Sequence, residues 1–373
     1  MKLSPKEIER YNRQIILSEI GMAGQQRLKA ASVLMIGAGG LGVPALQYMA
    51  AAGIGRIGIV DGDKIELSNL QRQVLYDEQE AGSSKSIVAK QKLSLLNSEI
   101  EITSFPELLS TDNAQQIFLP YDIILDGSDN FPTRYLVNDV CVKLNKPFIS
   151  GAVFKFTGQV GVFNYNESGT YRCLFPQPPA PEDRPDCNEI GVLGVVPGIM
   201  GMLMANEAIK LICGIGEVLA GKILSVDLMS MAFQTLAFRR DEKAVQEIKL
   251  SALLSSEEYE NFCLPSSRLN KVKEISVKDL KKILENRNQV QLVDVREPYE
   301  HEQENIGGEL IPFSEVMSNA DKISRLRQVI FYCKSGTRSH LIIQRLQAKY
   351  GMENLFNLKG GIIAYSEYAN SVV

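Results

Sequence analysis

The chain has 373 residues, of which 45% are hydrophobic and 23% are charged, and its formal net charge is −4. A chain of this length holds two or three domains of roughly 150 residues each. The slight negative charge offers no attraction for nucleic acid or for an anionic membrane, so we expect neither as a partner. The polar, charged start predicts no signal peptide, a cytoplasmic location and six reduced cysteines.

The first stretch, residues 4–30, predicts a helix. Ser4 followed three residues later by Glu7 is the pattern of a capping box. On the residues alone, Arg10 and Arg13 are expected to be solvated surface charges.

A glycine motif follows an apolar run at residues 33–36 and precedes an expected helix. Residues 37–42 read G-x-G-x-x-G, and a second apolar run at residues 57–60 ends in Asp61. Strand, glycine turn, helix, strand and acid together predict a nucleotide-binding βαβ unit. Its helix N-terminus would bind phosphate, and Asp61 would accept hydrogen bonds from ribose hydroxyls.

Helices and apolar strands alternate beyond this unit, which predicts a Rossmann-like, doubly wound α/β sheet. Alternation over residues 159–165 adds antiparallel strands, so we expect a mixed sheet. Ligands bind such sheets at the carboxyl ends of the strands, where Asp61, Asp126 and Asp129 fall. The expected elements are helices at 86–96, 112–118 and 133–144 and strands at 100–105, 121–125 and from 147.

The rest of the chain predicts a second, smaller α/β domain. The apolar stretch at 191–214 contains Pro197 and glycines, with Glu207 and Lys210 close by, so we expect a buried helix rather than a membrane span. A strand is expected at 222–227, after a long irregular stretch at 173–189. We expect a first domain over 1–250, a linker over 251–271 and a second domain over 272–373.

Two classes of enzyme compete for the nucleotide site: a nicotinamide-dependent oxidoreductase and a nucleotidyltransferase that uses ATP. A dehydrogenase usually needs a proton donor such as histidine, but both histidines lie beyond residue 300. Arg72, Lys85 and the aspartates suit a triphosphate with Mg²⁺, whose charge must be neutralised. The residues therefore favour ATP.

Several motifs, in this order, resemble the MoeB/ThiF adenylyltransferases, which are relatives of ubiquitin-activating enzymes. They are R-Y-N-R-Q at 10–14, the glycine motif, S-N-L-Q-R-Q at 68–73 and D-x-S-D-N at 126–130. The resemblance covers roughly residues 4–240. It implies an enzyme that uses ATP and Mg²⁺ to adenylate the C-terminal glycine of a ubiquitin-like sulfur carrier protein of the MoaD/ThiS type, which ends in Gly-Gly. It also implies a homodimer.

The same resemblance assigns residues to the site. Asp61 would hold the ribose, Arg72 and Lys85 would bind phosphates, and Asp129 would hold Mg²⁺. Arg13 would reach the ATP of the neighbouring subunit, which replaces its interpretation as a solvated charge. The residues that would line the rest of the site are Gly40, Ser68, Asn69, Leu70, Gln71 and Asn130.

The cysteines depart from the family pattern. Many members hold a structural zinc with two C-x-x-C pairs, but this chain has Thr170 before Cys173 and no cysteine at 239–250. One thiolate cannot make a four-ligand site, so we expect no zinc. Cys187, an incidental loop residue by its sequence alone, resembles the family's mobile cysteine. That thiol would attack the adenylated carrier or resolve a persulfide.

The second domain contains Cys333-Lys-Ser-Gly-Thr-Arg338 between an apolar strand at 329–332 and a helix that stops at Gly351. N–H groups at such a turn stabilise a thiolate or a persulfide anion. With L-V-D-V-R-E-P-Y-E-H and L-K-G-G-I-I-A-Y, the segment resembles rhodanese sulfurtransferases. Cys333 would then carry sulfane sulfur from a persulfide donor such as a cysteine desulfurase, while Asp294 and Arg296 shape the fold.

Together these expectations describe a bifunctional enzyme. The first domain adenylates the carrier, and the Cys333 persulfide converts the adenylate into a thiocarboxylate. In the alternative, the chain is an adenylyltransferase only and its second domain is a docking module. The sequence leaves the carrier open among those for molybdopterin, thiamine, cysteine and tRNA thiolation.

Overall fold

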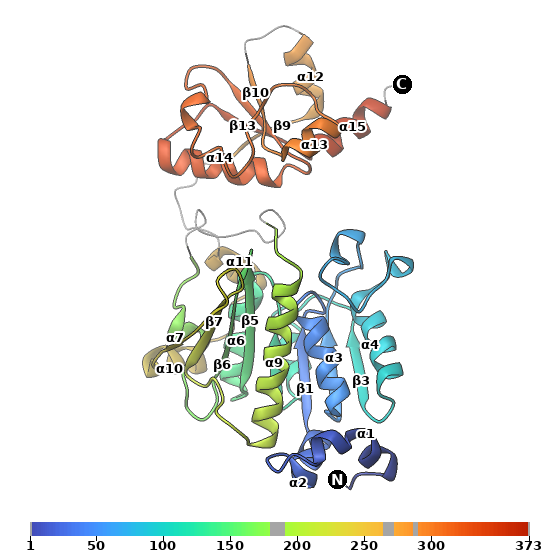
Figure 1. Cartoon of the computed structure of the whole chain (residues 1–373). Helices are drawn as coiled ribbons and strands as arrows, with labels where there is room; N and C mark the ends of the chain where they lie inside the picture. The colour runs from blue at the N-terminus through green and yellow to red at the C-terminus, as the bar shows by residue number, and fades with distance from the viewer. Residues whose placement is uncertain (1, 180–190, 264–271, 286–289, 372–373) are drawn as a thin grey trace. The chain divides into compact units, whose positions relative to one another are not determined.

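The computed structural model describes residues 2–179, 191–263, 272–285 and 290–371 (Figure 1). These residues form two compact units, one ending at residue 263 and one beginning at residue 272. Cys187, which the sequence analysis assigns to a mobile loop, lies outside the described residues.

The first unit is built on an eight-stranded sheet with the order β3-β2-β1-β4-β5-β6-β7-β8. The five strands from β3 to β5 are parallel, and β6, β7 and β8 continue the sheet antiparallel. This confirms the predicted Rossmann-like mixed sheet. The strands are β1 (Ser32–Ile36), β2 (Arg56–Val60), β3 (Glu101–Phe105), β4 (Ile123–Asp126), β5 (Phe148–Phe154), β6 (Thr157–Phe163), β7 (Lys222–Asp227) and β8 (Ala232–Ala237).

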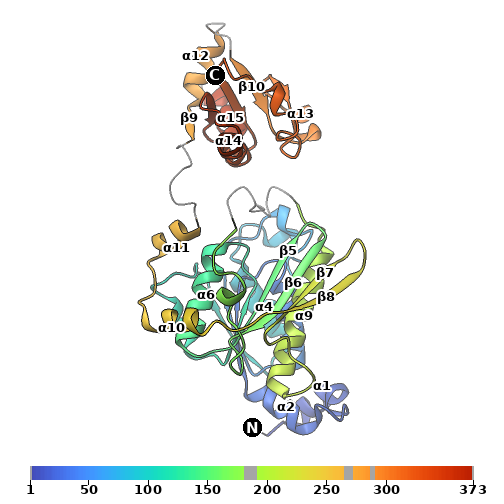
Figure 2. The ribbon, with the colours of Figure 1, turned by 90° about the vertical axis from the view of Figure 1, so that its left-hand side faces the viewer.

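Helices cover both faces of this sheet (Figure 2). Along β1, Val33 and Met35 point into one core, while Leu34 and Ile36 point into the other. One face carries α3 (Gly42–Ala52), α4 (Lys85–Leu96) and α9 (Val195–Cys213). The other carries α5 (Ala114–Phe118), α6 (Phe131–Lys143), α7 (Tyr171–Leu174), α10 (Glu242–Leu250) and α11 (Ser256–Cys263).

The apolar helix α9 is long and hydrophobic enough to cross a membrane by length and composition alone. In the structure it packs against α3, β5 and β6. Its Met200 and Met204 are fully buried, and each contacts a strand glycine, Gly158 and Gly151 respectively. These contacts are those of a core helix, as the sequence predicted, although the helix begins at Val195 rather than at residue 191.

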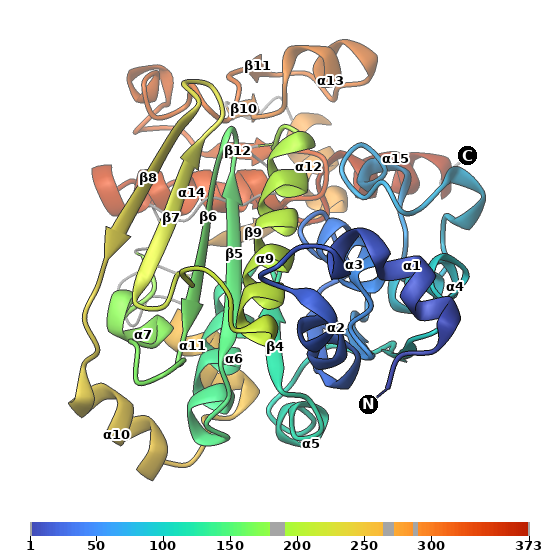
Figure 3. The same cartoon turned by 60° about the horizontal axis from the view of Figure 1, so that its bottom comes forward.

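The prediction of a single helix over residues 4–30 is wrong. The chain forms α1 (Pro5–Ile15) and α2 (Gly21–Ala30), which pack against each other (Figure 3). Gly21 has φ of +55°, a left-handed conformation that interrupts a continuous helix. The predicted capping box at the start is present: Glu7 N–H donates to Ser4 Oγ, and Ser4 N–H donates to Glu7 Oε2.

The sequence predicted that a linker begins at residue 251, but the folded first unit continues beyond that residue. Residues 256–263 form α11, which packs on α6. Its Tyr259 is 2% exposed and donates to Asp139 Oδ2, and Arg172 forms two further hydrogen bonds with the same carboxylate. Cys263 of α11 also lies in the hydrophobic core on this face of the sheet, and Phe262 packs against that core. The serine-rich, weakly periodic sequence did not reveal this helix.

The second unit has a parallel five-stranded sheet with the order β11-β10-β12-β13-β9. Val329 and Phe331 of β12 face one core, while Ile330 and Tyr332 face the other. The elements are β9 (Lys273–Ile275), α12 (Val277–Glu285), β10 (Gln291–Asp294), α13 (Pro298–Gln303), β11 (Glu309–Leu310), β12 (Val329–Tyr332), α14 (Thr337–Tyr350), β13 (Leu355–Leu358) and α15 (Gly361–Ser371). As predicted, α14 stops at Gly351, which caps it with φ of +64°.

Candidate active sites

The glycine loop after β1 is fixed by the acid at the end of β2. Asp61 Oδ2 accepts a hydrogen bond from Ala38 N–H at 2.7 Å, and Asp61 Oδ1 accepts one from Asp63 N–H at 2.8 Å. Burial raises the pKa of Asp61, while these N–H donors and the charge of Lys85 partly offset that effect. The carboxylate therefore lies against the loop that would receive phosphate.

Two cations lie next to this loop. Lys85, the first residue of α4, is 6% exposed, and its Nζ bonds Asp63 Oδ2 at 2.9 Å. Arg72 lies beside Gly40, because a Cβ on Gly40 would lie 3.4 Å from Arg72 Cγ. The structure thus brings Gly40, Asp61, Arg72 and Lys85 together at the carboxyl edge of the sheet.

The S-N-L-Q-R-Q segment folds as a short turn around Asn69. Its main-chain carbonyl accepts hydrogen bonds from Arg72 N–H and Gln73 N–H, and its Oδ1 accepts one from Glu66 N–H. Leu70 packs on the core, whereas Ser68 and Gln71 are exposed. Gln73 is 3% exposed, and its Oε1 is buried without a hydrogen-bond partner among the described residues.

The loop after β4 meets the glycine loop from the other side. Gly127 N–H donates to Ile36 O at 2.9 Å, so the two loops are joined directly. Fully buried Asp126 accepts hydrogen bonds from Ser128 N–H, Ser128 Oγ and Ser150 Oγ, and burial raises its pKa. Asp129 is exposed on the tip of this loop.

Asn130 serves as the N-cap of α6. Its Oδ1 accepts a hydrogen bond from Thr133 N–H at 2.9 Å. Asn130 is therefore a structural neighbour of Asp129 in this chain, and the cap sets where the loop ends and the helix begins.

Arg13 lies elsewhere. It is exposed in the last turn of α1, and α1 packs at the opposite end of the sheet from the glycine loop (Figure 1). The same helix buries Tyr11 against Gly53, at the C-terminal end of α3. Within one chain, the structure therefore does not bring Arg13 to the other site residues.

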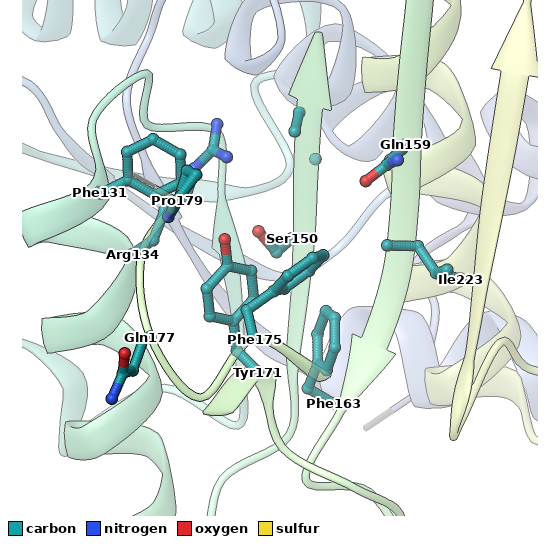
Figure 4. Close-up of a pocket in the computed structure, with 12 residues that line it drawn as sticks. Phe131, Arg134, Ser150, Gln159, Phe163, Tyr171, Phe175, Gln177, Pro179 and Ile223 are labelled. Atoms are coloured by element: carbon teal, nitrogen blue, oxygen red, sulfur yellow. The ribbon is translucent and has the colours of Figure 1, made fainter. Parts of the chain in front are cut away.

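A cavity of about 300 Å³ opens beside the Asp129 loop (Figure 4). Phe131 and Arg134 line it from the first turns of α6, and Arg134 Nη2 donates to Ser128 O at 2.9 Å. The remaining walls are mostly aromatic or aliphatic, with Gln159 and Ser150 as polar groups from the strands. Such a mostly apolar channel with a few polar groups suits an extended peptide better than a charged phosphate chain.

In the second unit, Cys333 follows β12 and is 1% exposed. Its Sγ accepts a hydrogen bond from Gly336 N–H at 3.2 Å. Arg338, in the first turn of α14, makes two hydrogen bonds of 2.7 Å with the Glu300 carboxylate. The loop thus presents an N–H donor to the sulfur, as the sequence predicted.

The first turn of helix α15 donates hydrogen bonds to the Cys333 loop. Ile362 N–H donates to Cys333 O at 2.9 Å, and Ile363 N–H donates to Lys334 O at 3.2 Å. These bonds engage the carbonyls of Cys333 and Lys334 on the side of α15, while the Gly336 N–H donates to the sulfur. Gly361 allows the approach, because a Cβ there would lie 2.4 Å from Cys333 O and 2.6 Å from Lys334 O.

Gly361→Ala is expected to lower sulfur loading of Cys333 by about a hundredfold, because the clash must displace the loop carbonyls. The measurement is the rate of thiosulfate-dependent mass gain on Cys333. Gly351→Ala is the matched control: Gly351 also has positive φ, but a Cβ there meets nothing within 4 Å. The control should lose about 1 to 2 kcal/mol of stability and keep its loading rate. Equal loading by both variants would contradict the role given to Gly361.

Asp294 and Arg296 form a buried ion pair, and His301 Nδ1 lies 2.8 Å from the same carboxylate. Arg296 also donates to the carbonyls of Glu300 and Glu304. Burial alone would raise the pKa of Asp294, but the hydrogen bonds from Arg296 and His301 outweigh it and lower the pKa below its usual 3.8. The pair holds α13 and its flanking chain against the sheet.

A lowered carboxyl pKa stabilises the folded state above the unfolded value, and that stabilisation is lost as the pH falls through the folded value. We therefore expect unfolding of the second unit to become easier below about pH 4, with a weaker pH dependence in Asp294→Asn. Calorimetry of the full chain at pH 5, 4 and 3 measures this. Asp321→Asn, at an exposed position, should follow the wild type. Identical pH dependence in Asp294→Asn and wild type would refute the assignment.

Comparison with known proteins decides the family. Residues 11–246 match the ThiF family, and residues 276–368 match the rhodanese-like domain. The chain is 40% identical over 376 residues to the probable adenylyltransferase/sulfurtransferase MoeZ of Mycobacterium tuberculosis, covering 98% of this chain and 94% of that protein. The chain belongs to the ThiF family. The resemblance stated from the motifs is thereby confirmed for both domains.

Other ThiF relatives agree with this assignment. The sulfur carrier protein adenylyltransferase of Thermus thermophilus is 50% identical over 248 residues, which cover 65% of this chain and 92% of that protein. Among solved structures, E. coli MccB with ATP superposes with a TM-score of 0.55 at 25% identity, covering 64% of this chain and 73% of that one.

Cys173, the cysteine that the sequence analysis considered as a zinc ligand, makes hydrogen bonds within the first unit. Cys173 Sγ accepts one from Asp241 N–H at 3.2 Å and lies 3.3 Å from Thr170 Oγ1. These bonds join the α7 segment to the start of α10. In the part of the chain that the structure describes, no group of three or more His, Cys, Asp or Glu side chains could hold a metal ion.

The motifs missed several residues of these ThiF and rhodanese sites. Asp63 pairs with Lys85, Gln73 lies under the glycine loop, and Glu300 pairs with Arg338. Asp63 follows Asp61 by two residues, and Gln73 ends the S-N-L-Q-R-Q motif, so their positions were a usable signal. Glu300 lies within the L-V-D-V-R-E-P-Y-E-H segment, but that motif does not reveal its pairing with Arg338, which lies 38 residues away.

Proposed function

We propose that this chain activates and sulfurates a ubiquitin-like sulfur carrier protein. The first unit adenylates the carrier's C-terminal glycine with ATP, and the second unit delivers sulfur from a Cys333 persulfide to give a thiocarboxylate. The observation that carries the proposal is the convergence of Arg72, Lys85 and the Asp129 loop on the glycine loop, in a chain that also holds Cys333 in a loop whose Gly336 N–H donates to the sulfur. The names of relatives with both domains support it.

The residues fit a magnesium nucleotide. The glycine loop leads into the N-terminus of α3, whose N–H groups would bind phosphate. Asp61 can accept hydrogen bonds from ribose, and Gln73 Oε1 is a buried acceptor that lacks a partner among the described residues. Asp129, exposed on its loop, would hold Mg²⁺, which would neutralise charge on the triphosphate. On binding nucleotide, the Lys85 ammonium would exchange its ion pair with the exposed Asp63 for contact with the more highly charged triphosphate.

Adenylation requires positioning and charge neutralisation more than proton transfer. The carrier carboxylate attacks the α-phosphorus, the bond to the β,γ-phosphates breaks, and pyrophosphate leaves. Arg72 and Lys85 would stabilise the charge that spreads over the phosphates. The cavity beside Phe131 and Arg134 borders the Asp129 loop, so the carrier's tail would approach along it.

In the next step, sulfur is transferred to the acyl-adenylate of the carrier. The outer sulfur of the Cys333 persulfide attacks the acyl carbon and AMP leaves, which gives an acyl disulfide. A second thiolate then attacks Cys333 Sγ, which releases the thiocarboxylate and leaves a disulfide. We propose Cys187 for this second thiol. A dithiol reductant would then reduce this disulfide to two thiols, and a cysteine desulfurase or another persulfide protein would reload the freed Cys333 thiolate.

We further propose a homodimer in the cytoplasm. Arg13 is exposed and lies far from the nucleotide edge of its own chain, so it would serve the site of the partner. The boundary between the two catalytic domains would lie within residues 264–271.

Two assays on the full chain test the proposal. ATP–pyrophosphate exchange should require a carrier ending in Gly-Gly, and thiosulfate should add one sulfur to Cys333. If Cys333→Ala still sulfurates the carrier fully, the second unit is a docking module. If no exchange occurs and a nicotinamide cofactor binds, the chain is an oxidoreductase instead.

A further inference from the structure

The Ser339 hydroxyl lies next to the Cys333 sulfur. Ser339 is fully buried in α14, and its Oγ is 3.4 Å from Cys333 Sγ. The same oxygen is 2.7 Å from Asn357 Oδ1 and 3.2 Å from Gly336 O. A hydroxyl has one proton to donate, so only one of these three acceptors can receive it at a time.

The acceptor that receives the proton depends on the charge of the sulfur. A neutral thiol is a weak acceptor, so Asn357 Oδ1 should receive the proton while Cys333 is a thiol. A hydrogen bond to an ionised acceptor is roughly twice as strong as a neutral one. Once Cys333 is a thiolate, rotation about the Cβ–Oγ bond would turn the proton toward Sγ without moving a heavy atom.

We propose that Ser339 is a positioning residue for Cys333, whose hydroxyl stabilises the thiolate in competition with Asn357. The inference rests on the proposed sulfur transfer. In that step the Cys333 thiolate bonds to the outer sulfur of a donor persulfide, the donor's S–S bond breaks, and its inner sulfur leaves as a thiolate. The outer sulfur keeps its proton, so atoms and charge balance.

The charged side chains near the Cys333 loop are unchanged in each variant that tests the role of Ser339. Lys334 and Arg338 flank the sulfur in sequence, and Glu300 of α13 pairs with Arg338. Gly336 N–H also donates to Sγ whatever residue stands at position 339. A change in sulfur reactivity would therefore report the hydroxyl itself.

The experiment is alkylation of the full chain by iodoacetamide between pH 6 and pH 10. Modification of Cys333 is followed in the tryptic peptide 328–334. Ser339→Ala should react about tenfold more slowly at pH 7, with its pH profile displaced upward and the same maximal rate at high pH. Asn357→Ala should displace the profile downward, because it removes the competing acceptor. Ser335→Ala, an exposed hydroxyl of the same loop, should match the wild type.

Two outcomes would overturn the inference: a Ser339→Ala profile identical to wild type, or displacement of both variants in the same direction. A lower maximal rate in Ser339→Ala would indicate a damaged loop and would also count against it. Alkylation needs no sulfur donor, so the result is separate from the proposed function. That function fails by itself if wild-type Cys333 gains no sulfur from thiosulfate.

Discussion

Lys85→Ala is expected to lower carrier-dependent ATP–pyrophosphate exchange by about a hundredfold to a thousandfold. The buried ammonium lies beside the glycine loop, and its partner Asp63 is exposed, so the lysine is available to a phosphate. Removing it leaves the charge on the triphosphate uncompensated on that side. The measurement is exchange of labelled pyrophosphate into ATP at saturating carrier.

Lys90→Ala is the matched control, because Lys90 belongs to the same helix and is exposed. It should exchange pyrophosphate at the wild-type rate. Thiosulfate loading of Cys333 should be unchanged in both variants, which would show that the chain is folded. If Lys85→Ala keeps the full rate of pyrophosphate exchange, the assignment of phosphate binding to Lys85 is wrong.

Cys333→Ser should abolish both thiosulfate-dependent mass gain and carrier thiocarboxylate, with adenylation intact. The serine hydroxyl cannot carry sulfane sulfur, and the Gly336 N–H contact leaves the loop otherwise unchanged. Mass spectrometry of the enzyme and of the carrier gives both readouts. The expected loss is complete, in contrast to a partial effect from a residue that only positions the sulfur.

Cys173→Ser serves as the control for that substitution, because Cys173 is half-buried and distant in sequence from the rhodanese loop. It should load sulfur on Cys333 normally. A Cys333→Ser enzyme that still produces thiocarboxylate would place sulfur delivery on another residue, and the docking interpretation of the second unit would then stand.

The local motifs predicted the site best where sequence neighbours form it. The glycine loop, Asp61 and the Cys333 loop each lie at the end of an apolar strand, so strand, turn and helix could be read together. Gly361 contacts the Cys333 loop and Asn357 contacts Ser339 from distant positions in the sequence, and no local pattern reveals such contacts.

The fold was predicted least well where the apolar pattern of the sequence is weak. Helix α11 is held by Tyr259 on the buried Asp139–Arg172 pair, and β8 is almost entirely exposed. Neither gives the periodicity from which helices and strands are recognised. The break before Gly21 was missed because residues on both sides favour a helix.

The most direct test of the account is exchange of labelled pyrophosphate into ATP by the purified chain, with and without a carrier protein ending in Gly-Gly. We predict exchange with the intact carrier and none with a carrier that lacks its terminal glycine. Absence of exchange with every diglycine carrier offered, by enzyme that is folded and loads sulfur on Cys333, would contradict adenylation by the first unit.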